Sequence, residues 1–114
     1  MASVVHISIV PCSGVVGPSG GSASIPSPAY VIDGQEIAAL VTKVTSTVIS
    51  TAAHVGMMWR VAVSGDIDVY GECNTSPVFT NLATANTKGL LLMKTVEYFR
   101  ITQAGEKWAV IAVA

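Results

Sequence analysis

The chain has 114 residues, of which 51% are hydrophobic and 11% are charged, and its formal net charge is −1. A chain of this length forms a single domain around one core. A usual soluble domain has about 25% charged residues, so six Lys or Arg and seven Asp or Glu are few to keep a monomer dispersed. We therefore expect partner chains to cover much of the surface.

The sequence argues against two classes of partner. The basic residues are scattered singly, without the clustered positive charge that binds a phosphate backbone, which predicts no nucleic-acid partner. No stretch approaches the roughly 20 continuous apolar residues of a membrane-spanning helix, which predicts no membrane partner. The start, MASVVHISIVPCSG, has no Lys or Arg before its short apolar run, so we expect no secretory signal and a protein that folds where it is made.

Residues 1–32 contain no Asp, Glu, Lys or Arg. We predict a first strand or arm at Ser3 to Val10, then a Gly/Pro/Ser-rich loop or extended arm from Pro11 to Pro28, because this composition disfavours helices and regular strands. We accordingly divide the chain into an N-terminal strand and arm, residues 1–28, and a β-sandwich domain, residues 29–114. The arm is either a plain linker or a segment that reaches over a neighbouring subunit with its apolar residues, Val15, Val16 and Ile25.

The next segment predicts a turn followed by strands. Asp33-Gly34 lies between apolar residues, and Asp-Gly is a strong signal for a tight hairpin turn. The apolar residues of 37–55 would also fit one face of a helix. The many β-branched residues favour strands instead, because their stiff side chains suit a pleated surface.

The second half of the chain has clearer strand patterns. Apolar and more polar residues alternate from Trp59 to Val63, and the alternation resumes from Ile67 to Val69. Between these two runs we expect a bend, a bulge or a tight turn at Gly65. Residues 74–89 are rich in Asn, Thr, Pro and Gly, which predicts a loop. Residues 90–101 predict one long strand or two short ones.

The chain ends in a predicted hairpin, with 103–106 as its loop and 107–114 as its returning strand. This last strand is apolar at nearly every position, which is typical of a strand with both faces covered. Several short strands with turn signals between them, and no convincing helix, predict an all-β fold. We expect a single antiparallel β-sandwich or small jelly roll with an extended N-terminal arm or loop.

Few residues offer catalytic or metal-binding chemistry. His6 and His54 are isolated, and each is more typical of a surface or hydrogen-bonded histidine than of a ligand. Asp66, Asp68 and Glu72 share one strand parity and would suit a hard cation such as calcium, but a solvated strand face is the simpler interpretation. We predict no catalytic residue, no metal site and no cofactor, and hence a protein that is not an enzyme.

The cysteines and aromatic residues are interpreted as packing residues. Cys12 and Cys73 have no metal or redox spacing, which favours free, buried thiols, while a bridge within or between chains stays open. We expect the aromatic residues to fill a core and an interface, because each buries a large area. The candidate residues for an oligomer or assembly interface are Val15, Val16, Ile25, Trp59, Tyr98 and Trp108.

Two runs of the second half, RVAVSGDIDVYGECNTSPVFTN and LLLMKTVEYFRITQAGEKWAVIAVA, form a further pattern. From Trp59 to Ala114 this pattern resembles small structural proteins of tailed bacteriophages, in which a strand with a Gly-Asp turn precedes a Thr/Asn-rich loop. The departures are Met93-Lys94-Thr95, which replace a Pro-Ala-Asn run, and the longer uncharged arm. The matching residues are Gly65 to Val69, Gly71, Glu97 to Phe99, Gly105 and Lys107 to Ile111.

The resemblance implies a compact β-sandwich in the virion, on the head shell, the neck or the tail, assembled in the host cytoplasm. We expect a non-enzymatic capsid decoration or cement subunit. Its partners would be copies of itself, in a homotrimer or other symmetric oligomer, and the major capsid protein or other virion proteins. The alternative is a neck, tail or spike accessory protein that acts as a carbohydrate-binding β-sandwich module through exposed Trp and Tyr.

Overall fold

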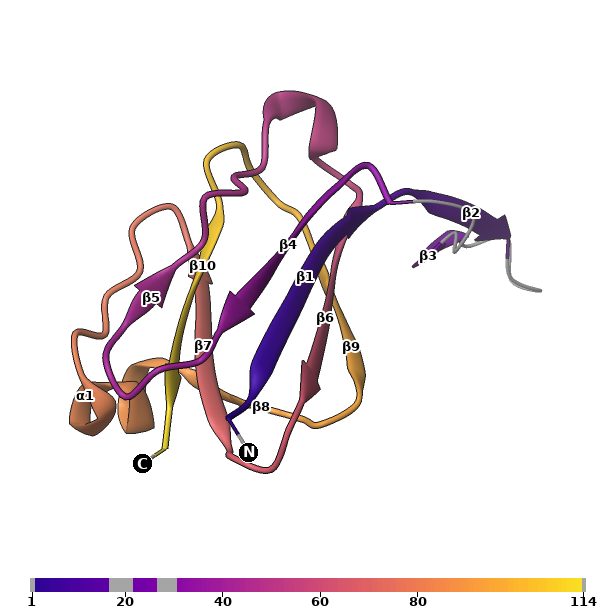
Figure 1. Cartoon of the computed structure of the whole chain (residues 1–114). Coiled ribbons are helices and arrows are strands. Elements are labelled where there is room, and N and C mark those ends of the chain that lie inside the picture. The colour runs from indigo at the N-terminus through magenta and orange to yellow at the C-terminus, as the bar shows by residue number, and fades with distance from the viewer. Residues whose placement is uncertain (1, 17–21, 27–30, 114) are drawn as a thin grey trace.

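The computed structural model of this chain describes residues 2–16, 22–26 and 31–113. It confirms the all-β prediction, because two four-stranded antiparallel sheets pack face to face (Figure 1). The first sheet has the order β4-β1-β6-β9 and consists of β4 (Asp33–Ala38), β1 (Val4–Val10), β6 (Met58–Ser64) and β9 (Val96–Arg100). The second has the order β5-β10-β7-β8 and consists of β5 (Val44–Thr45), β10 (Lys107–Ala112), β7 (Val69–Asn74) and β8 (Leu90–Leu92).

The period-two pattern of the first sheet places its apolar residues between the sheets. On β6, Trp59, Val61 and Val63 are buried, while the residues between them are only half-buried. They lie opposite Ile9, Ile7 and Val5 of β1 in the antiparallel register. The residues on the inner faces of both sheets form one core cluster. The alternation read from the sequence therefore gives the correct inner face for this strand.

The apolar C-terminal strand is covered on both faces, as predicted. β10 lies between β5 and β7 in the second sheet. Trp108 and Val110 face the core between the sheets. Ala109 and Ile111 face the other way and pack in a second buried cluster with Phe79 and Ala85. A strand with no solvated face needs apolar residues at consecutive positions, which explains the run WAVIA.

The second cluster is covered by a short helix, α1 (Leu82–Lys88), which the sequence analysis assigned to a loop. Asn81 caps its first turn, because the Asn81 side chain accepts a hydrogen bond from the Thr84 backbone N–H at 3.0 Å. The Thr84 hydroxyl in turn accepts from the Asn81 backbone N–H at 3.1 Å. These reciprocal bonds satisfy donors that a short helix otherwise leaves unpaired. A second short helical turn, η1 (Ala52–His54), precedes β6.

Gly65 forms the predicted turn, which carries the chain from the first sheet to the second. β6 ends at Ser64 and β7 begins at Val69. Gly65 has φ +112, and a Cβ atom at this position would lie 2.7 Å from the carbonyl oxygen of Ala2. Glycine is required there, because the turn approaches the N-terminal backbone closely and has a φ that L side chains rarely adopt.

The predicted turn at Asp33-Gly34 is wrong. Both residues belong to β4, where Asp33 lies opposite Ile9 and Gly34 lies opposite Ser8 of β1. β4 therefore pairs with a strand more than twenty residues earlier in the chain. The Asp33 carboxylate accepts a hydrogen bond from the Gly34 backbone N–H at 2.9 Å, an interaction that suits the start of a strand as well as a turn.

The predicted C-terminal hairpin is also wrong. β9 pairs with β6 in the first sheet, whereas β10 pairs with β5 and β7 in the second. The segment 101–106 therefore crosses between the sheets instead of joining two paired strands. Backbone hydrogen bonds from Gly105 to Ser50 and from Ser50 to Glu106 hold this crossing in place, at 2.8 and 2.9 Å.

The strands predicted in residues 37–55 are present only in part. β4 continues to Ala38 and β5 has two residues, while the rest of the segment is mainly irregular. Buried serines fasten it to β10: the Ser46 hydroxyl accepts from the Trp108 backbone N–H at 3.0 Å, and the Ser50 hydroxyl accepts from the Glu106 backbone N–H at 2.9 Å. Side-chain hydrogen bonds thus replace a regular ladder along this edge.

The N-terminal segment contributes both to the sandwich and to an arm. β1 is a central strand of the first sheet, so the division between residues 28 and 29 does not separate the sandwich from what precedes it. The strands β2 (Cys12–Val16) and β3 (Ser22–Pro26) pair with each other and extend away from the sandwich (Figure 1). The side chains of Val15, Val16 and Ile25 lie outside the described part of the structure. No helix within the described residues is long and apolar enough to cross a membrane.

Candidate functional site

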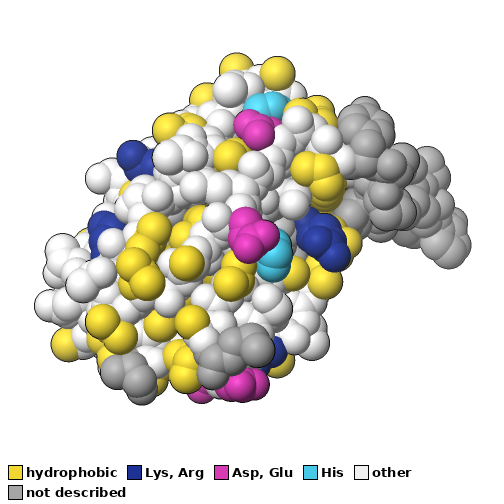
Figure 2. Space-filling view, in the orientation of Figure 1, with side chains coloured by type: hydrophobic (Ala, Val, Ile, Leu, Met, Phe, Trp, Pro, Cys, Tyr) yellow, Lys and Arg dark blue, Asp and Glu magenta, His cyan; other side chains and the backbone are white. Residues whose placement is uncertain are grey.

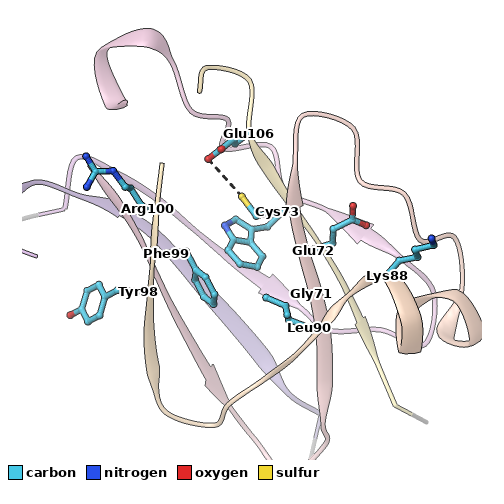
Figure 3. A pocket seen from close by; sticks show the side chains of 10 residues that line it. Gly71, Glu72, Cys73, Lys88, Leu90, Tyr98, Phe99, Arg100 and Glu106 are labelled. Carbon is cyan, nitrogen blue, oxygen red and sulfur yellow. Dashed lines mark hydrogen bonds between the residues drawn. The ribbon is translucent and has the colours of Figure 1, made fainter. Parts of the chain in front are cut away.

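A cleft of about 530 Å³ opens between the two sheets, where β9 of the first sheet faces β7 and β8 of the second (Figure 3). β8 pairs with β7 only at Val69 to Gly71, so this side of the sandwich is incompletely closed. The cleft is lined by Gly71, Glu72, Cys73, Lys88, Leu90, Tyr98, Phe99, Arg100, Glu106 and Trp108.

The base of the cleft is aromatic. The rings of Phe99 and Trp108 meet edge to face, with their centroids 5.2 Å apart. Figure 3 shows the Phe99 side chain extending from β9 toward β7. Trp108 is completely buried, and its indole N–H has no hydrogen-bond partner among the described residues. This contact closes the core beneath the cleft with a rigid apolar surface.

Glu106 is a buried carboxylate that connects the two sheets. Its Oε1 atom accepts a hydrogen bond from the Trp59 indole N–H of the first sheet at 3.2 Å. Its Oε2 atom accepts from the Thr102 hydroxyl at 2.8 Å and from the Thr102 backbone N–H at 3.3 Å. Because a buried charge is costly unless it is hydrogen-bonded, these donors explain how the carboxylate is accommodated.

Cys73 contacts the same carboxylate, with its Sγ atom 3.9 Å from Glu106 Oε1 (Figure 3). Burial, followed by the neighbouring carboxylates of Glu106 and Glu72, raises the pKa of the Cys73 thiol from 9.0 to about 12. The thiol is therefore protonated at neutral pH. A protonated thiol is a poor nucleophile and a poor metal ligand.

The charged residues at the rim have structural contacts or point outward. The Glu72 carboxylate accepts backbone N–H bonds from Val78 and Phe79 at 2.7 and 3.1 Å, which fixes the loop before α1. In Figure 3, the side chains of Lys88 and Arg100 point away from Cys73. The described lining residues thus hold no activated nucleophile with an adjacent base, and the arrangement suits binding or packing better than catalysis.

Asp66, Asp68 and Glu72, which the sequence analysis considered as calcium ligands and interpreted as a solvated strand face, have other contacts. Asp68 forms an ion pair with Lys94 at 3.2 Å, and the Lys94 ammonium group also donates to the Asp66 carbonyl oxygen at 2.7 Å. The Glu72 carboxylate accepts a hydrogen bond from the Val78 backbone N–H, in the loop before α1. Within the part of the chain that the structure describes, no group of three or more His, Cys, Asp or Glu residues could hold a metal ion.

The two histidines and the two cysteines also have separate places. His6 lies 3.7 Å from Glu36 on the outer face of the first sheet, and the His54 Nδ1 atom accepts the Thr51 backbone N–H at 3.0 Å. Cys12 and Cys73 do not form a disulfide with each other, and both are partly buried instead of fully buried as predicted.

Three of the predicted interface residues can be compared with their exposure. Trp59 and Trp108 are 0% exposed and fill the core, so neither side chain offers a surface to another chain. Tyr98 is 43% exposed at the rim of the cleft and remains available for contact. The sequence pattern identified the correct residues as large and apolar, but burial within the sandwich decided which of them stayed accessible.

A group of exposed apolar side chains on β8, on β9 and between these strands was not predicted from the sequence. Five large hydrophobic side chains between Leu90 and Tyr98 are between 41% and 57% exposed. We call them the β8–β9 ridge: Leu90, Leu91, Met93, Val96 and Tyr98. The run LLLM was the available signal, because alternation on one short strand cannot bury three consecutive leucines.

A second hollow, of about 430 Å³, lies where the two ends of the chain meet and is lined mainly by apolar residues, including the exposed Leu40 and Val41. The face drawn in Figure 2 has few charged side chains, and some of its acidic side chains lie beside histidines. Apolar surface is therefore distributed over the sandwich and is densest, by sequence, along the β8–β9 ridge.

Comparisons with protein-family models, with curated proteins and with solved structures found no match to this chain.

Proposed function

We propose that this chain is a non-enzymatic structural subunit of a bacteriophage virion, a capsid decoration or cement protein that assembles with copies of itself and with the major capsid protein. The observation that carries the proposal is an apolar surface on a chain with few charges. Twelve large hydrophobic side chains are exposed among the described residues. Burying such surface against neighbours stabilises a shell by about 25 cal/mol per Å² of apolar area.

The N-terminal hairpin supports the same proposal. β2 and β3 pair only with each other and project from the sandwich (Figure 1). An isolated two-stranded hairpin is at best marginally stable in water. The segment that contains it has no charged residue to solvate it. Contact with an adjacent subunit or with the underlying shell would provide the missing packing.

The cleft supports a non-enzymatic role. Its thiol is protonated at neutral pH, and its buried carboxylate is engaged by Trp59 and Thr102. The resemblance of residues 59–114 to small phage structural proteins supports the setting on a virus particle. The carbohydrate-binding alternative has less support, because the two Trp side chains that would stack on a sugar are sealed in the core.

The test compares particles assembled with and without this chain. We expect purified protein to bind to particles that lack it, at a fixed ratio to the capsid subunits, and to raise the temperature at which the particles release their genome. A β-sandwich of similar size with a highly charged surface serves as the control for non-specific binding. If the protein does not bind above this control, the proposal is rejected.

A further inference from the structure

The hollow where the two ends of the chain meet is one continuous apolar surface. Its volume is about 430 Å³, and none of the described residues that line it is charged. In its lining, Ala39 and Ala112 are buried parts of the core, whereas Leu40 and Val41 are 51% and 63% exposed. The hollow therefore keeps large apolar side chains in water at one end of the sandwich, and covering them is favourable.

The N-terminal hairpin is a second uncovered feature of the same chain. β2 and β3 form a sheet of their own, and among the described elements they have at most slight contacts with any other. Residues 11–32, which include this hairpin, contain no charged residue. Because a two-stranded hairpin is at best marginally stable in water, this one needs packing that its own sandwich does not provide.

The hairpin and the hollow lie at opposite ends of β1. Ser3 lines the hollow just before β1 begins, and β2 begins at Cys12, just after β1 ends. The stretch between these two residues spans about 30 Å at about 3.3 Å per residue, whereas the five-residue strands of the hairpin span only about 16 Å. In Figure 1, the hairpin projects beyond one end of the sandwich and the N and C ends of the chain lie at the other. The hairpin therefore does not reach the hollow of its own copy.

A second copy of the chain covers both features at once. Each copy has one uncharged hairpin and one uncharged hollow at opposite ends, so the hairpin of one copy can lie in the hollow of the next. No charged group is removed from water when these two surfaces meet, which avoids the main cost of such a contact. A head-to-tail contact of this kind repeats from copy to copy and forms a ring if the rotation closes.

We propose that the N-terminal hairpin of one copy docks in the apolar hollow beside Leu40 and Val41 of the next copy. This head-to-tail contact links successive copies of a symmetric oligomer. The inference rests on the proposed function, since it names the surfaces through which copies of the subunit meet, but it can fail while that function stands.

The test uses two variants of the full chain, each of which alters one half of the contact. Val41→Lys adds a charge to the hollow. Val15→Lys/Val16→Lys adds charges at two successive positions of β2, so that either face of the hairpin carries one. In sedimentation velocity we expect the wild type to associate as its concentration rises, and each variant alone to have a dissociation constant raised by about 100-fold, because its new charge is buried without a partner. Val78→Lys is the matched control, since Val78 is 57% exposed but does not line the hollow, and it should associate like the wild type.

A mixture of the two variants tests the direction of the contact. The Val41→Lys copy keeps an unaltered hairpin, and the Val15→Lys/Val16→Lys copy keeps an unaltered hollow. An equal mixture should therefore form a dimer with wild-type affinity. It should form no larger species, because the hairpin and the hollow that remain free in this dimer are the altered ones.

Hydrogen exchange on the wild type provides a readout that needs no variant. Backbone amides of β2 and β3, and those of residues 40–42 at the hollow, should exchange more slowly at high protein concentration than at low concentration. Amides of α1 should not change.

The inference is overturned if both variants associate like the wild type, if their mixture forms no dimer, or if exchange in β2 and β3 does not depend on concentration. A wild type that stays monomeric but binds to particles overturns the inference and leaves the proposed function intact. In that case, loss of particle binding by Val41→Lys would assign the hollow to the shell instead of to a second copy. A wild type that neither associates nor binds to particles rejects both.

Discussion

The substitution Glu106→Ala tests whether the buried carboxylate fastens the two sheets together. The variant leaves the Trp59 indole N–H, which is completely buried in the native structure, without its acceptor. An unsatisfied buried donor costs about 1–3 kcal/mol, and loss of the hydrogen bonds from Thr102 costs roughly 1 kcal/mol more. We therefore expect the free energy of unfolding to fall by about 2–4 kcal/mol.

The matched variant is Glu106→Gln, which keeps the size of the side chain and one acceptor oxygen. We expect a smaller loss of about 1 kcal/mol, because the amide oxygen can still accept from Trp59 while the amide nitrogen cannot accept from Thr102. The measurement is urea unfolding followed by Trp fluorescence. Protein concentration is held constant, since the apparent stability of any chain that self-associates depends on concentration.

A double-mutant cycle separates the hydrogen bond from the loss of packing. Combining Trp59→Phe with Glu106→Ala removes both partners, so the coupling energy reports their interaction without the packing change of each single variant. We expect a coupling of about 1–2 kcal/mol. The reasoning is refuted if Glu106→Ala changes the stability by less than about 0.5 kcal/mol, or if the two substitutions are additive within the same margin.

Three further substitutions test the turn, the thiol and the helix cap. Gly65→Ala should lower the free energy of unfolding by about 1–3 kcal/mol, which is more than Gly56→Ala should cost. Both glycines have positive φ, but only at Gly65 would an added Cβ atom meet other backbone atoms. Equal losses of the two variants in urea unfolding would contradict this interpretation. The Cys12→Ser variant leaves Cys73 as its one cysteine. At pH 8, Cys73 should react with a thiol reagent about 1000-fold more slowly in the native protein than in denaturant, because its pKa is raised to about 12 in the native state. Similar rates in the two states would contradict the raised pKa. The same shift predicts that, relative to Cys73→Ser, stability conferred by the native thiol is present below pH 9 and is lost as the pH rises toward 12. Asn81→Ala should cost about 1 kcal/mol and speed hydrogen exchange in α1, whereas unchanged exchange would show that packing alone holds the helix.

The predicted strands were confirmed where periodicity extended over a whole strand. The alternation from Trp59 to Val63 gave the inner face of β6, and the apolar run near the C-terminus gave a strand covered on both faces. The pairing of strands was not predictable by the same means. A Gly-containing segment such as 103–106 can join two paired strands or cross between two sheets, and its local sequence is compatible with either.

The helix and the apolar ridge were missed for related reasons. α1 has seven residues and only one buried side chain, so it lacks the apolar periodicity by which longer helices are detected. Its capping pair, Asn81 and Thr84, was the available signal. Exposure of the ridge depends on which strands end a sheet, and a single sequence contains that information only indirectly. The same dependence placed Trp59 and Trp108 in the core instead of at a surface.

The apolar excess of the sequence is not by itself evidence for partners. Part of it is consumed within the chain, because β10 is buried on both faces and needs two layers of apolar residues, one between the sheets and one beneath α1. What remains is informative through its location. Surface hydrophobic residues scattered singly are ordinary in a monomer, whereas five large exposed ones within residues 90–98 concentrate apolar area in one short segment. If the chain assembles as proposed, substitutions in the segment 90–98 should change its association while leaving the sandwich folded, because these side chains are exposed and are not part of the core.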